Sequence, residues 1–561
     1  MRLSVGSRFT LLLCLSLPAV ACGGEDAQES NLPPIYPITE ARYTSLQQIW
    51  LPKDPPASTG AERRTDTFKI TDIDRYAELG LGVELGPGEP WIEHDELAAD
   101  WASFQPAKRR SLLFFWHSSD PQVVDEESPI RLEGVTALSI GSTYRPQDHL
   151  STQAFESQVR TLRAIQDELQ RPLDFTIITG DLSDGGQRNE LGWVFQILNG
   201  GSVDPDTGKD DDPVQGPGND FNDPYQSLGV DGPWYATIGN HEVQYTGIAK
   251  ANQEVQDAAV GEQVFQGLEY FAGLSPKDGL QGGFRDGSTP NAEVRTSGPT
   301  PSDPNRYIPD LPELVSIISA EDGDPVGHGY STADIDAGRG HYSFNPIEGL
   351  PLRMIALNTL SSDVAGSEGA IDDAQWQWLQ TELEQATSAH EIVFVASHHK
   401  SGDIKLGGHK GAELASLLAQ HENVLLHLTG HGHTSDSGII LPQAEADAGF
   451  RGYWEVMTPS TLDFPMQTRF WELVDEGGGF VSIYATILEQ NAPEGSLGHR
   501  AREIAAGHGW FQDSKLRADF EMRRQHRNLI LRFKLPADVA AAISSAPGHD
   551  SIASEDTLAA F

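Results

Sequence analysis

Cysteine is almost absent from this sequence, in which Cys14 and Cys22 are the only two among 561 residues. Cys14 falls in an N-terminal apolar run that we expect to be removed, and Cys22, at the end of that run, is the expected lipidation site. The mature chain is therefore predicted to have no free thiol and no disulfide. The same absence excludes zinc sites that are built from thiolates.

Cations are also scarce, since 39 lysines and arginines stand against 82 aspartates and glutamates, giving a formal net charge of −43. Because affinity for nucleic acid depends on clustered cations, this balance argues against a nucleic-acid-binding protein. It does not exclude phosphate chemistry in a local cationic pocket. Apolar residues make up 38% of the chain, which suffices for a substantial core. The length favours a large domain with additions, or two domains.

The N-terminus has the features of an export signal. Arg2 and Arg8 precede a short apolar run over residues 9–21, and no later run reaches the ~18 apolar residues of a membrane span. Residues 19–22, Ala-Val-Ala-Cys, resemble the lipobox of bacterial lipoproteins, although Ala19 stands where leucine is usual. We expect a signal peptide over 1–21 and a lipid at Cys22 that anchors an exported chain to the cell envelope. The alternative is an ordinary cleaved signal with an incidental cysteine.

The chain from residue 112 onward alternates short apolar runs with helical patterns, which predicts an α/β architecture. The expected strands are Leu112–Trp116, Phe175–Thr179, Trp234–Ile238, Met354–Leu357, Ile392–Ala396 and Val424–Thr429. Helices are expected over residues 155–169, after Asp372 or Asp373, and around 414–418. We divide the mature chain into a tether and extension (22–108), a main domain (109–465) and a C-terminal part of closing strands, helix and tail (466–561). Insertions are expected near 200–230 and 243–350, and the aspartates at 204–212 only loosely resemble a calcium loop.

Residues that bind metals or transfer protons directly follow five of these runs. The five segments are Ser119-Asp120-Pro121-Gln122, Gly180-Asp181-Leu182-Ser183-Asp184, Gly239-Asn240-His241-Glu242, Ser397-His398-His399 and Gly430-His431-Gly432-His433. Because the carboxyl ends of strands in open α/β sheets meet in one crevice, the five segments are predicted to lie together. Any one such match is weak, whereas the ordered set of five is specific.

The residue types also suit a common chemistry. Aspartate, asparagine and histidine offer the oxygen and nitrogen donors that first-row divalent or trivalent metals prefer. A carboxylate such as Asp181 can bridge two cations, and paired metals ~3.5–4 Å apart recur in phosphoester hydrolysis. We therefore expect two ions of manganese, iron or zinc.

The five segments resemble the signature of the calcineurin-like metallophosphoesterase superfamily, over roughly residues 112–465. This resemblance implies two stacked β-sheets flanked by helices, with the site at the strand ends. It places one metal on Asp120, Asp181 and His433. It places the second metal on Asp181, Asn240, His398 and His431, so that Asp181 bridges the two ions. His241 matches the general acid of the family, and Asp184 matches an acidic position that orients that histidine.

Two positions depart from the family pattern. The first segment reads Asp-x-Gln where Asp-x-His is usual, so Gln122 is expected either to ligate the first metal weakly through its oxygen or to lie beside the ligands. Asp184 stands where purple acid phosphatases have a ligating tyrosine, so no coloured tyrosinate–iron centre is expected. His409 and Arg145 are candidate contacts of the substrate phosphate. A solvated loop explains His409 equally well, and an ion pair at the surface is the better explanation for Arg145.

These features predict a phosphoester hydrolase with a dinuclear metal centre. A metal-bound hydroxide would attack phosphorus in line while His241 protonates the leaving oxygen of a small phosphomonoester or phosphodiester. One alternative is a non-catalytic metal-binding surface protein with the same fold. Another retains the enzyme and makes the insertions over 200–350 a cap that determines substrate specificity.

Overall fold

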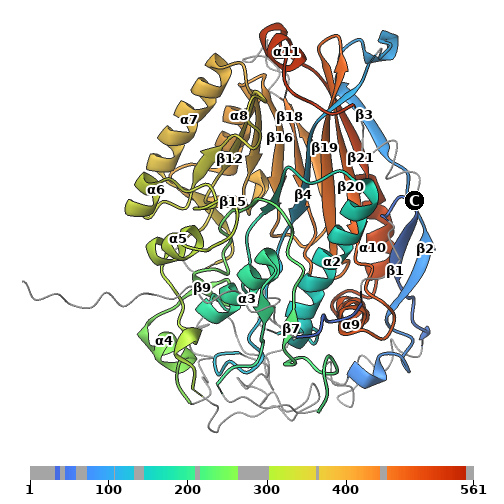
Figure 1. Ribbon diagram of the computed structural model, residues 1–561, viewed down its shortest axis with the longest axis vertical. Helices are drawn as coiled ribbons and strands as arrows, with labels where there is room; N and C mark the ends of the chain where they lie inside the picture. Colours follow the sequence, from blue (N-terminus) through green and yellow to red (C-terminus); the bar gives the residue numbers. More distant parts are fainter. Residues whose placement is uncertain are drawn as a thin grey trace, which may run out of the picture. The chain divides into compact units, whose positions relative to one another are not determined.

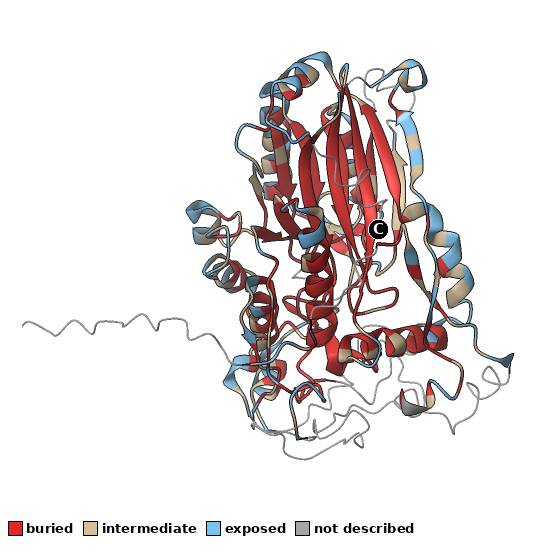
Figure 2. Ribbon diagram, turned by 45° about the vertical axis from the view of Figure 1, so that its right-hand side comes forward, coloured by how far each residue is buried: buried red, intermediate tan, exposed pale blue. Residues whose placement is uncertain are grey.

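Two β-sheets packed face to face form the centre of the molecule (Figure 1). The computed structural model describes residues 32–37, 44–57, 73–106, 108–131, 144–208, 215–262, 302–361, 366–441 and 452–550. Rings of Phe115 and Phe394, one from each sheet, lie 6.4 Å apart in the core between them. Figure 2 shows that the inner strands of both sheets are almost entirely buried. The predicted α/β sandwich is confirmed.

The first sheet has seven strands in the order β3-β21-β20-β19-β4-β5-β8. Their bounds are Ile92–Leu97 (β3), Leu529–Lys534 (β21), Phe480–Glu489 (β20), Gln467–Gly477 (β19), Arg110–Ser118 (β4), Phe175–Ile178 (β5) and Trp234–Ala236 (β8). Strands β4, β5 and β8 are parallel, so that their carboxyl ends lie at one edge. These are the strands that the sequence predicts before the first three motif segments.

The second sheet has six strands in the order β11-β12-β14-β16-β18-β17. Their bounds are Tyr342–Phe344 (β11), Leu352–Ala356 (β12), Ile392–Ala396 (β14), Val424–Thr429 (β16), Tyr453–Met457 (β18) and Asp436–Ile440 (β17). Side chains of β14 alternate between two cores, as the pleat of a strand requires. Phe394 faces the seven-stranded sheet, whereas Val393 and Val395 pack with helices α7 (Asp373–Ser388) and α8 (Gly411–Ala419). A strand buried on both faces reads as a continuous apolar run, which explains why it was predictable.

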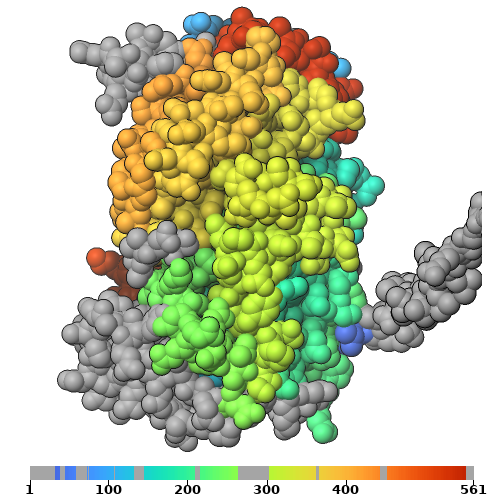
Figure 3. Space-filling view, turned by 90° about the vertical axis from the view of Figure 1, so that its left-hand side faces the viewer, coloured from blue at the N-terminus to red at the C-terminus, as the bar shows by residue number. Residues whose placement is uncertain are grey.

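Within the described parts of the chain, four two-stranded ribbons and further helices surround these sheets. The ribbons pair β1 (Gln48–Pro52) with β2 (Val83–Pro87), β6 (Ser202–Val203) with β7 (Tyr225–Gln226), β9 (Gln244–Tyr245) with β10 (Ala249–Lys250), and β13 (Gly369–Ile371) with β15 (Ile404–Gly407). The helices are α2 (Ser151–Leu169), α3 (Arg188–Asn199), α4 (Gln253–Ala259), α5 (Leu311–Ser319), α6 (Thr332–Asp336), α9 (Leu497–Gln512), α10 (Leu516–Met522) and α11 (Ala537–Ser544). Figure 3 shows the face on which the described parts of the 243–350 insertion gather, in green and yellow-green.

The predicted helices are present, and their ends have the expected chemistry. Helix α2 ends at Gln170, which has a left-handed φ of 52° just before Pro172. At the start of α7, the carboxylate of Asp372 accepts a hydrogen bond of 2.7 Å from the backbone N–H of Gln375.

The C-terminal part completes the first sheet, as the sequence predicts, but residues from 540 onward are not simply a tail. Helix α11 extends to Ser544, and its Val539 and Ile543 are buried in the main core. An apolar pair at i and i+4 in an alanine-rich stretch is too short a signal to distinguish a docked helix from a tail. Among the described residues, no helix has the length and apolar character to span a membrane. The predicted signal peptide and Cys22 lie outside the described residues.

Candidate metal centre

Strained backbone marks the loops that follow the central strands. Five predicted site residues other than glycine have φ between 43° and 70°: Asp120, Gln122, Asp181, His431 and His433. Side chains with a Cβ seldom adopt this left-handed conformation, and such residues cluster at functional sites, where the surrounding structure holds them in place. The loops are also tightly packed, because a Cβ at Gly239 would lie 2.1 Å from Asp181 Oδ1.

Most of the predicted ligands converge around the ring of His398. Its Nε2 lies 3.2 Å from Asp181 Oδ2, 3.0 Å from Asn240 Oδ1, 3.2 Å from His431 Nδ1 and 4.0 Å from Asp120 Oδ1. Ligand atoms of Asp120, Asp181 and His398 all lie within 4.8 Å of one another, and all three residues are buried. The structure thus brings together side chains from all five motif segments.

The hydrogen bonds of His398 test whether this cluster suits a cation. Its Nδ1 lies 2.7 Å from the carbonyl oxygen of Thr179, which only accepts, so Nδ1 carries the proton. In the neutral ring, Nε2 then presents a lone pair to the oxygens of Asn240 and Asp181. The amide of Asn240 is oriented by donation from its Nδ2 to the carbonyl of Gly247 at 2.8 Å. Acceptors that face one another in a buried site are reconciled by a metal ion, so these residues fit the expected group.

His433 joins this cluster through Asp120. Its Nδ1 lies 2.7 Å from Asp463 Oδ2, and its Nε2 lies 3.2 Å from Asp120 Oδ1. Asp120 Oδ2 accepts from the backbone N–H of His431 at 3.0 Å, whereas Oδ1 is buried without a hydrogen-bond partner among the described residues. Asp120 Oδ1 and His433 Nε2 thus offer two donor atoms beside the His398 cluster.

The pKa shifts at the centre reflect crowded carboxylates. Burial opposes the charged form of His398 and of His433, yet the neighbouring aspartates outweigh burial and raise the two pKa values to about 9 and about 10. Burial and the charge of His398 lower the pKa of His431 to about 3. Burial also disfavours the charge of Asp181, but His398 and His241 hold the pKa of this carboxyl well below its ordinary value. In the metal-free protein, protons on His398 and His433 thus offset the charge of the aspartates, and bound metal ions would replace these protons.

Two buried residues of the motif segments support the ligands. His399 Nε2 donates to the carbonyl of Ser367 at 2.9 Å, and its Nδ1 accepts from the hydroxyl of Thr359 at 2.9 Å, so neither nitrogen is available to a metal. The Glu242 carboxylate accepts from the backbone N–H groups of Asp181 at 3.1 Å and Gly239 at 2.6 Å. Glu242 thereby holds two ligand loops together, a role that we did not predict although Glu242 stands within the third segment.

His241 lies at the edge of the centre. Its Nδ1 donates to the backbone carbonyl of Asp184 at 2.7 Å, and the Asp184 carboxylate lies 3.4 Å from the same nitrogen. This contact fixes the ring so that Nε2 lies 4.0 Å from Asp181 Oδ2. His241 lines the cavity over the centre.

Gln122 does not offer its oxygen to a metal in this arrangement. Because a guanidinium only donates, the Gln122 atom 2.7 Å from Arg145 Nη1 is the amide oxygen. The amide nitrogen of Gln122 then faces Asp181 Oδ2 at 3.2 Å. Of the two alternatives predicted for Gln122, these contacts favour the one in which it lies beside the ligands, as a brace between Arg145 and Asp181.

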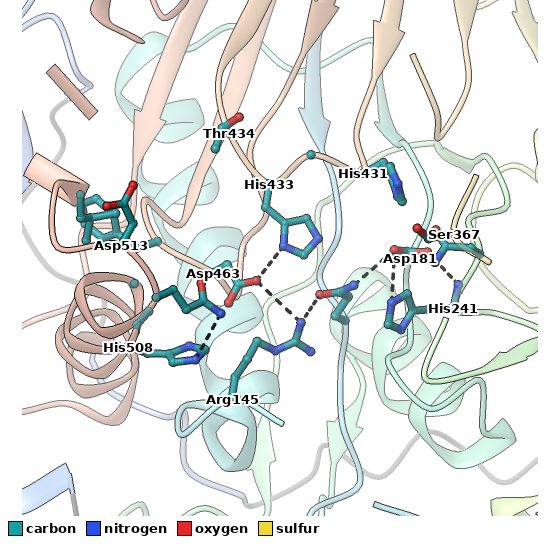
Figure 4. A pocket seen from close by; sticks show the side chains of 18 of the residues that line it. Arg145, Asp181, His241, Ser367, His431, His433, Thr434, Asp463, His508 and Asp513 are labelled. Carbon is teal, nitrogen blue, oxygen red and sulfur yellow. Dashed lines mark hydrogen bonds and ion pairs between the residues drawn. The ribbon is translucent and has the colours of Figure 1, made fainter. Parts of the chain in front are cut away.

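Arg145 is buried and surrounded by acidic groups, so its contacts match the alternative of an ion pair, at a buried and not a surface position. Its Nε donates to Asp148 at 2.8 Å, its Nη2 pairs with Asp184, and its Nη1 lies 3.7 Å from Asp463. Burial opposes its charge, but these three carboxylates raise its pKa well above the ordinary value. Figure 4 shows Arg145 between the Asp463–His433 pair and His241.

The structure does not bring His409 to the centre. Its ring stacks on Trp376 with centroids 4.2 Å apart, and its nitrogens lie 3.3 Å from Asp373 and 3.6 Å from Glu413. His409 is not among the described residues that line the cavity. The loop that carries it, predicted to contact phosphate, instead docks on the start of α7.

A cavity of about 600 Å³ lies over the centre, and part of its wall comes from residues that we did not predict. Helix α9 contributes Ala505, His508, Gly509 and Gln512, which share one helical face. Phe464, Asp513 and Leu516 complete this wall, part of which Figure 4 shows. The sequence signal that could have identified this wall is the pair His508 and Gln512, which share a helical face with the small residues Ala505 and Gly509. No described residue of 200–230 lines the cavity, and Ile248 alone does so from 243–350.

Comparison with known proteins completes the description. The model of one protein family, described as calcineurin-like phosphoesterase, matches residues 115–435. The chain is similar to the crystal structure of a dimetal phosphatase from Danio rerio, with a TM-score of 0.36, 13% identity, and coverage of 68% of this chain and 100% of that chain. It is also similar to a structure of PhoD, with a TM-score of 0.28, 10% identity, and coverage of 78% and 81%. No curated protein matches the chain.

Proposed function

The chain belongs to the calcineurin-like phosphoesterase family and is a metal-dependent phosphoesterase, and from this premise we propose that it hydrolyses small phosphomonoesters or phosphodiesters at a two-metal centre. The observation that carries the proposal is the convergence of lone pairs on His398 Nε2, where Asn240 Oδ1 and Asp181 Oδ2 lie 3.0 and 3.2 Å away. Without a metal, a proton on His398 Nε2 satisfies these acceptors, as the pKa of about 9 indicates, and a bound metal ion would take the place of that proton.

The contacts around His398 and Asp120, together with the family pattern, support two sets of donors. Asp181, Asn240, His398 and His431 would hold one ion, and Asp120, Asp181 and His433 the other. When bound, divalent ions such as manganese, iron or zinc would neutralise phosphoryl oxygens and make water more acidic. The mixed oxygen and nitrogen donors suit these metals better than calcium.

His241 is placed to handle the proton of the leaving group. Its Nδ1–H is held by the Asp184 carbonyl at 2.7 Å, which leaves Nε2 as the atom that exchanges a proton in the cavity. The Asp184 carboxylate, 3.4 Å from Nδ1, would pair with the ring in its imidazolium form. In that form His241 donates its Nε2 proton to the departing alkoxide as the ester bond to phosphorus breaks.

Two variants separate metal binding from proton transfer. The protein is stripped of metal, reloaded with manganese, zinc or iron, and assayed with a chromogenic phosphomonoester and the matching diester. Asp181→Asn should lose both bound metal and turnover, whereas His241→Ala should keep its metal but lose about 10²–10⁴ of the rate. His409→Ala is the matched control, because this histidine lies outside the cavity wall. Wild-type turnover in either test variant would overturn the assignment.

A non-catalytic metal-binding protein is the competing function. It is supported if metal binds at stoichiometry and no ester is hydrolysed with any of the three ions. The brace made by Gln122, in place of the usual histidine ligand, is the feature that favours this alternative. The otherwise complete donor set argues against it.

We also propose that the chain is exported and anchored through a lipid at Cys22, on the basis of residues 1–22. Cys22→Ala should release the protein from the membrane fraction, and Cys14→Ala should not. Equal partitioning of the two variants would support a signal that is simply cleaved. The net charge of −43 makes nucleic acid an unfavourable substrate.

A further inference from the structure

We propose that the catalytic cavity selects esters that carry a single phosphate and an uncharged, partly apolar leaving group, and that α9 and α10 determine this selectivity. The proposal rests on the proposed phosphoesterase function and adds the substrate class. It concerns the part of the cavity away from the metal ligands.

The described cavity wall has no cation available for a second phosphate. Arg145 is the only lysine or arginine among the described lining residues. It already contacts Asp148, Asp184 and Asp463, and its side chain is only 2% exposed. A second phosphate would therefore enter this cavity without a partner, which is unfavourable for a desolvated charge.

The α9 side of the wall adds neutral or negative groups. Burial lowers the pKa of His508 to about 4, so its ring is neutral at pH 7. Asp513 stands at the exposed end of the wall, where it adds negative charge at the cavity mouth. The negative charge of Asp513 at the mouth and the lack of an available cation inside the cavity both disfavour a substrate with a second phosphate.

An apolar recess continues the cavity between α10 and the Phe464–Pro465 segment. This recess has a volume of about 60 Å³ and shares Thr434, Phe464 and Leu516 with the main cavity. Pro465 and Phe520 supply further apolar surface. An apolar ring or chain on the leaving group would bury its surface here at roughly 25 cal/mol per Å².

The arginines of the recess do not provide an anion site. Arg527 pairs with Glu89 through two contacts of 2.6 Å. Arg523 donates to the carbonyl of Ser435 at 3.2 Å, and the charge of Asp519, which also lines the recess, interacts with it. Each arginine is thus accompanied by an acidic side chain, as Arg145 is in the main cavity.

A matched pair of substrates tests the charge selectivity. The metal-loaded protein is assayed with phenyl phosphate and with 1,4-phenylene bisphosphate, which differ by one phosphate group. We expect kcat/KM for the monophosphate to be at least about tenfold higher, because the second phosphate is desolvated without a partner. Asp513→Lys should narrow this ratio about two- to fivefold, the range for an exposed charge pair. Glu503→Lys makes the same charge change on α9 outside the described cavity wall and should leave the ratio unchanged.

A second pair tests the apolar recess. Leu516→Asn should lower kcat/KM for phenyl phosphate relative to glycerol 2-phosphate, whereas Met522→Gln, at an exposed position of α10 that is not among the lining residues, should not. Equal kcat/KM for the mono- and bisphosphate, or ratios that neither Asp513→Lys nor Leu516→Asn changes, would overturn the proposal.

Binding measurements keep the test independent of turnover. Calorimetry with phenylphosphonate and 1,4-phenylenebisphosphonate on the metal-loaded protein should show the same preference for a single anionic group. If no ester is hydrolysed but this preference holds, the phosphoesterase mechanism fails while the selectivity stands. If esters are hydrolysed and both phosphonates bind equally, the selectivity fails while the phosphoesterase function stands.

Discussion

Arg145→Lys is expected to weaken the metal centre without touching a ligand. Arg145 contacts Gln122 at 2.7 Å, Asp148 at 2.8 Å and Asp463 at 3.7 Å, and it also pairs with Asp184. Asp463 holds His433, and Asp184 lies beside His241. A lysine keeps the charge but has a single ammonium on a flexible stem, so it cannot serve all four acceptors in one plane.

The expected size of the effect on metal affinity and activity depends on the groups that the contacts of Arg145 hold in position. Groups that orient metal ligands typically change metal affinity or activity by about 10–100-fold when they are replaced, and we expect both to fall within this range. Stability should fall as well, because breaking a buried pair costs about 3–5 kcal/mol when a charge is left without its partner. Lysine retains a charge near Asp148, so the loss should lie at or below the lower end of that range.

Arg131→Lys is the matched control. Arg131 also contacts Asp148, at 2.9 Å, and it pairs with Glu126, but it does not line the cavity. The assay measures bound manganese against free manganese, kcat and KM separately, and the midpoint of thermal unfolding. Both variants should unfold earlier, and only Arg145→Lys should lose metal affinity and kcat. If the two variants lose stability equally and Arg145→Lys keeps wild-type metal affinity and kcat, Arg145 has only a structural role.

Three further predictions concern residues away from the ligands. His409→Ala should keep kcat/KM within about twofold of the wild type in a steady-state assay, because His409 stacks on Trp376 outside the cavity wall. Arg306→Met should lose about 3–5 kcal/mol in urea unfolding, since it strands the fully buried Asp125 2.8 Å away, and adding Asp125→Asn should restore part of the loss. Burial raises the pKa of Glu489 to about 8, so the folded chain holds a proton there that the unfolded chain releases above its ordinary pKa of about 4.3. Stability should therefore fall between about pH 4.3 and 8, by at most about 1.4 kcal/mol per pH unit from this group, and Glu489→Gln should flatten that part of the unfolding profile.

The sheets and the ligand loops were predictable because each has a local signal. Strand β14 is buried on both faces, so its five residues form an uninterrupted apolar run that ends where Ser397 begins. Polar residues after such runs must lie at strand ends, and parallel strands collect those ends at one edge. The position of the five segments, each directly after a predicted strand, was therefore enough to predict that they lie together at one edge of the sheets.

Contacts between side chains that are far apart in the sequence were not predictable, because no local pattern indicates them. Nothing near Arg145 in the sequence indicates that it is buried against Asp184 and Asp463, which lie 39 and 318 positions further along. His409 was misplaced for the same reason, because the partner that holds its ring, Trp376, is on a helix 33 residues earlier. The α9 wall lies still further from the motif segments, and only the fold brings it to the cavity.

The unusual first segment can be understood together with Arg145 and not from position 122 alone. A guanidinium needs an acceptor, and the Gln122 amide supplies one while its nitrogen still reaches the carboxylate of Asp181. An imidazole that bound metal at this position would turn a lone pair toward the ion, and its remaining N–H would face Arg145. Glutamine therefore gives up a ligand and gains a contact that links the metal centre to the acidic groups on either side of it. Replacing the usual histidine by Gln122 therefore changes how the centre is supported. It is compatible with the presence of the other six predicted ligands.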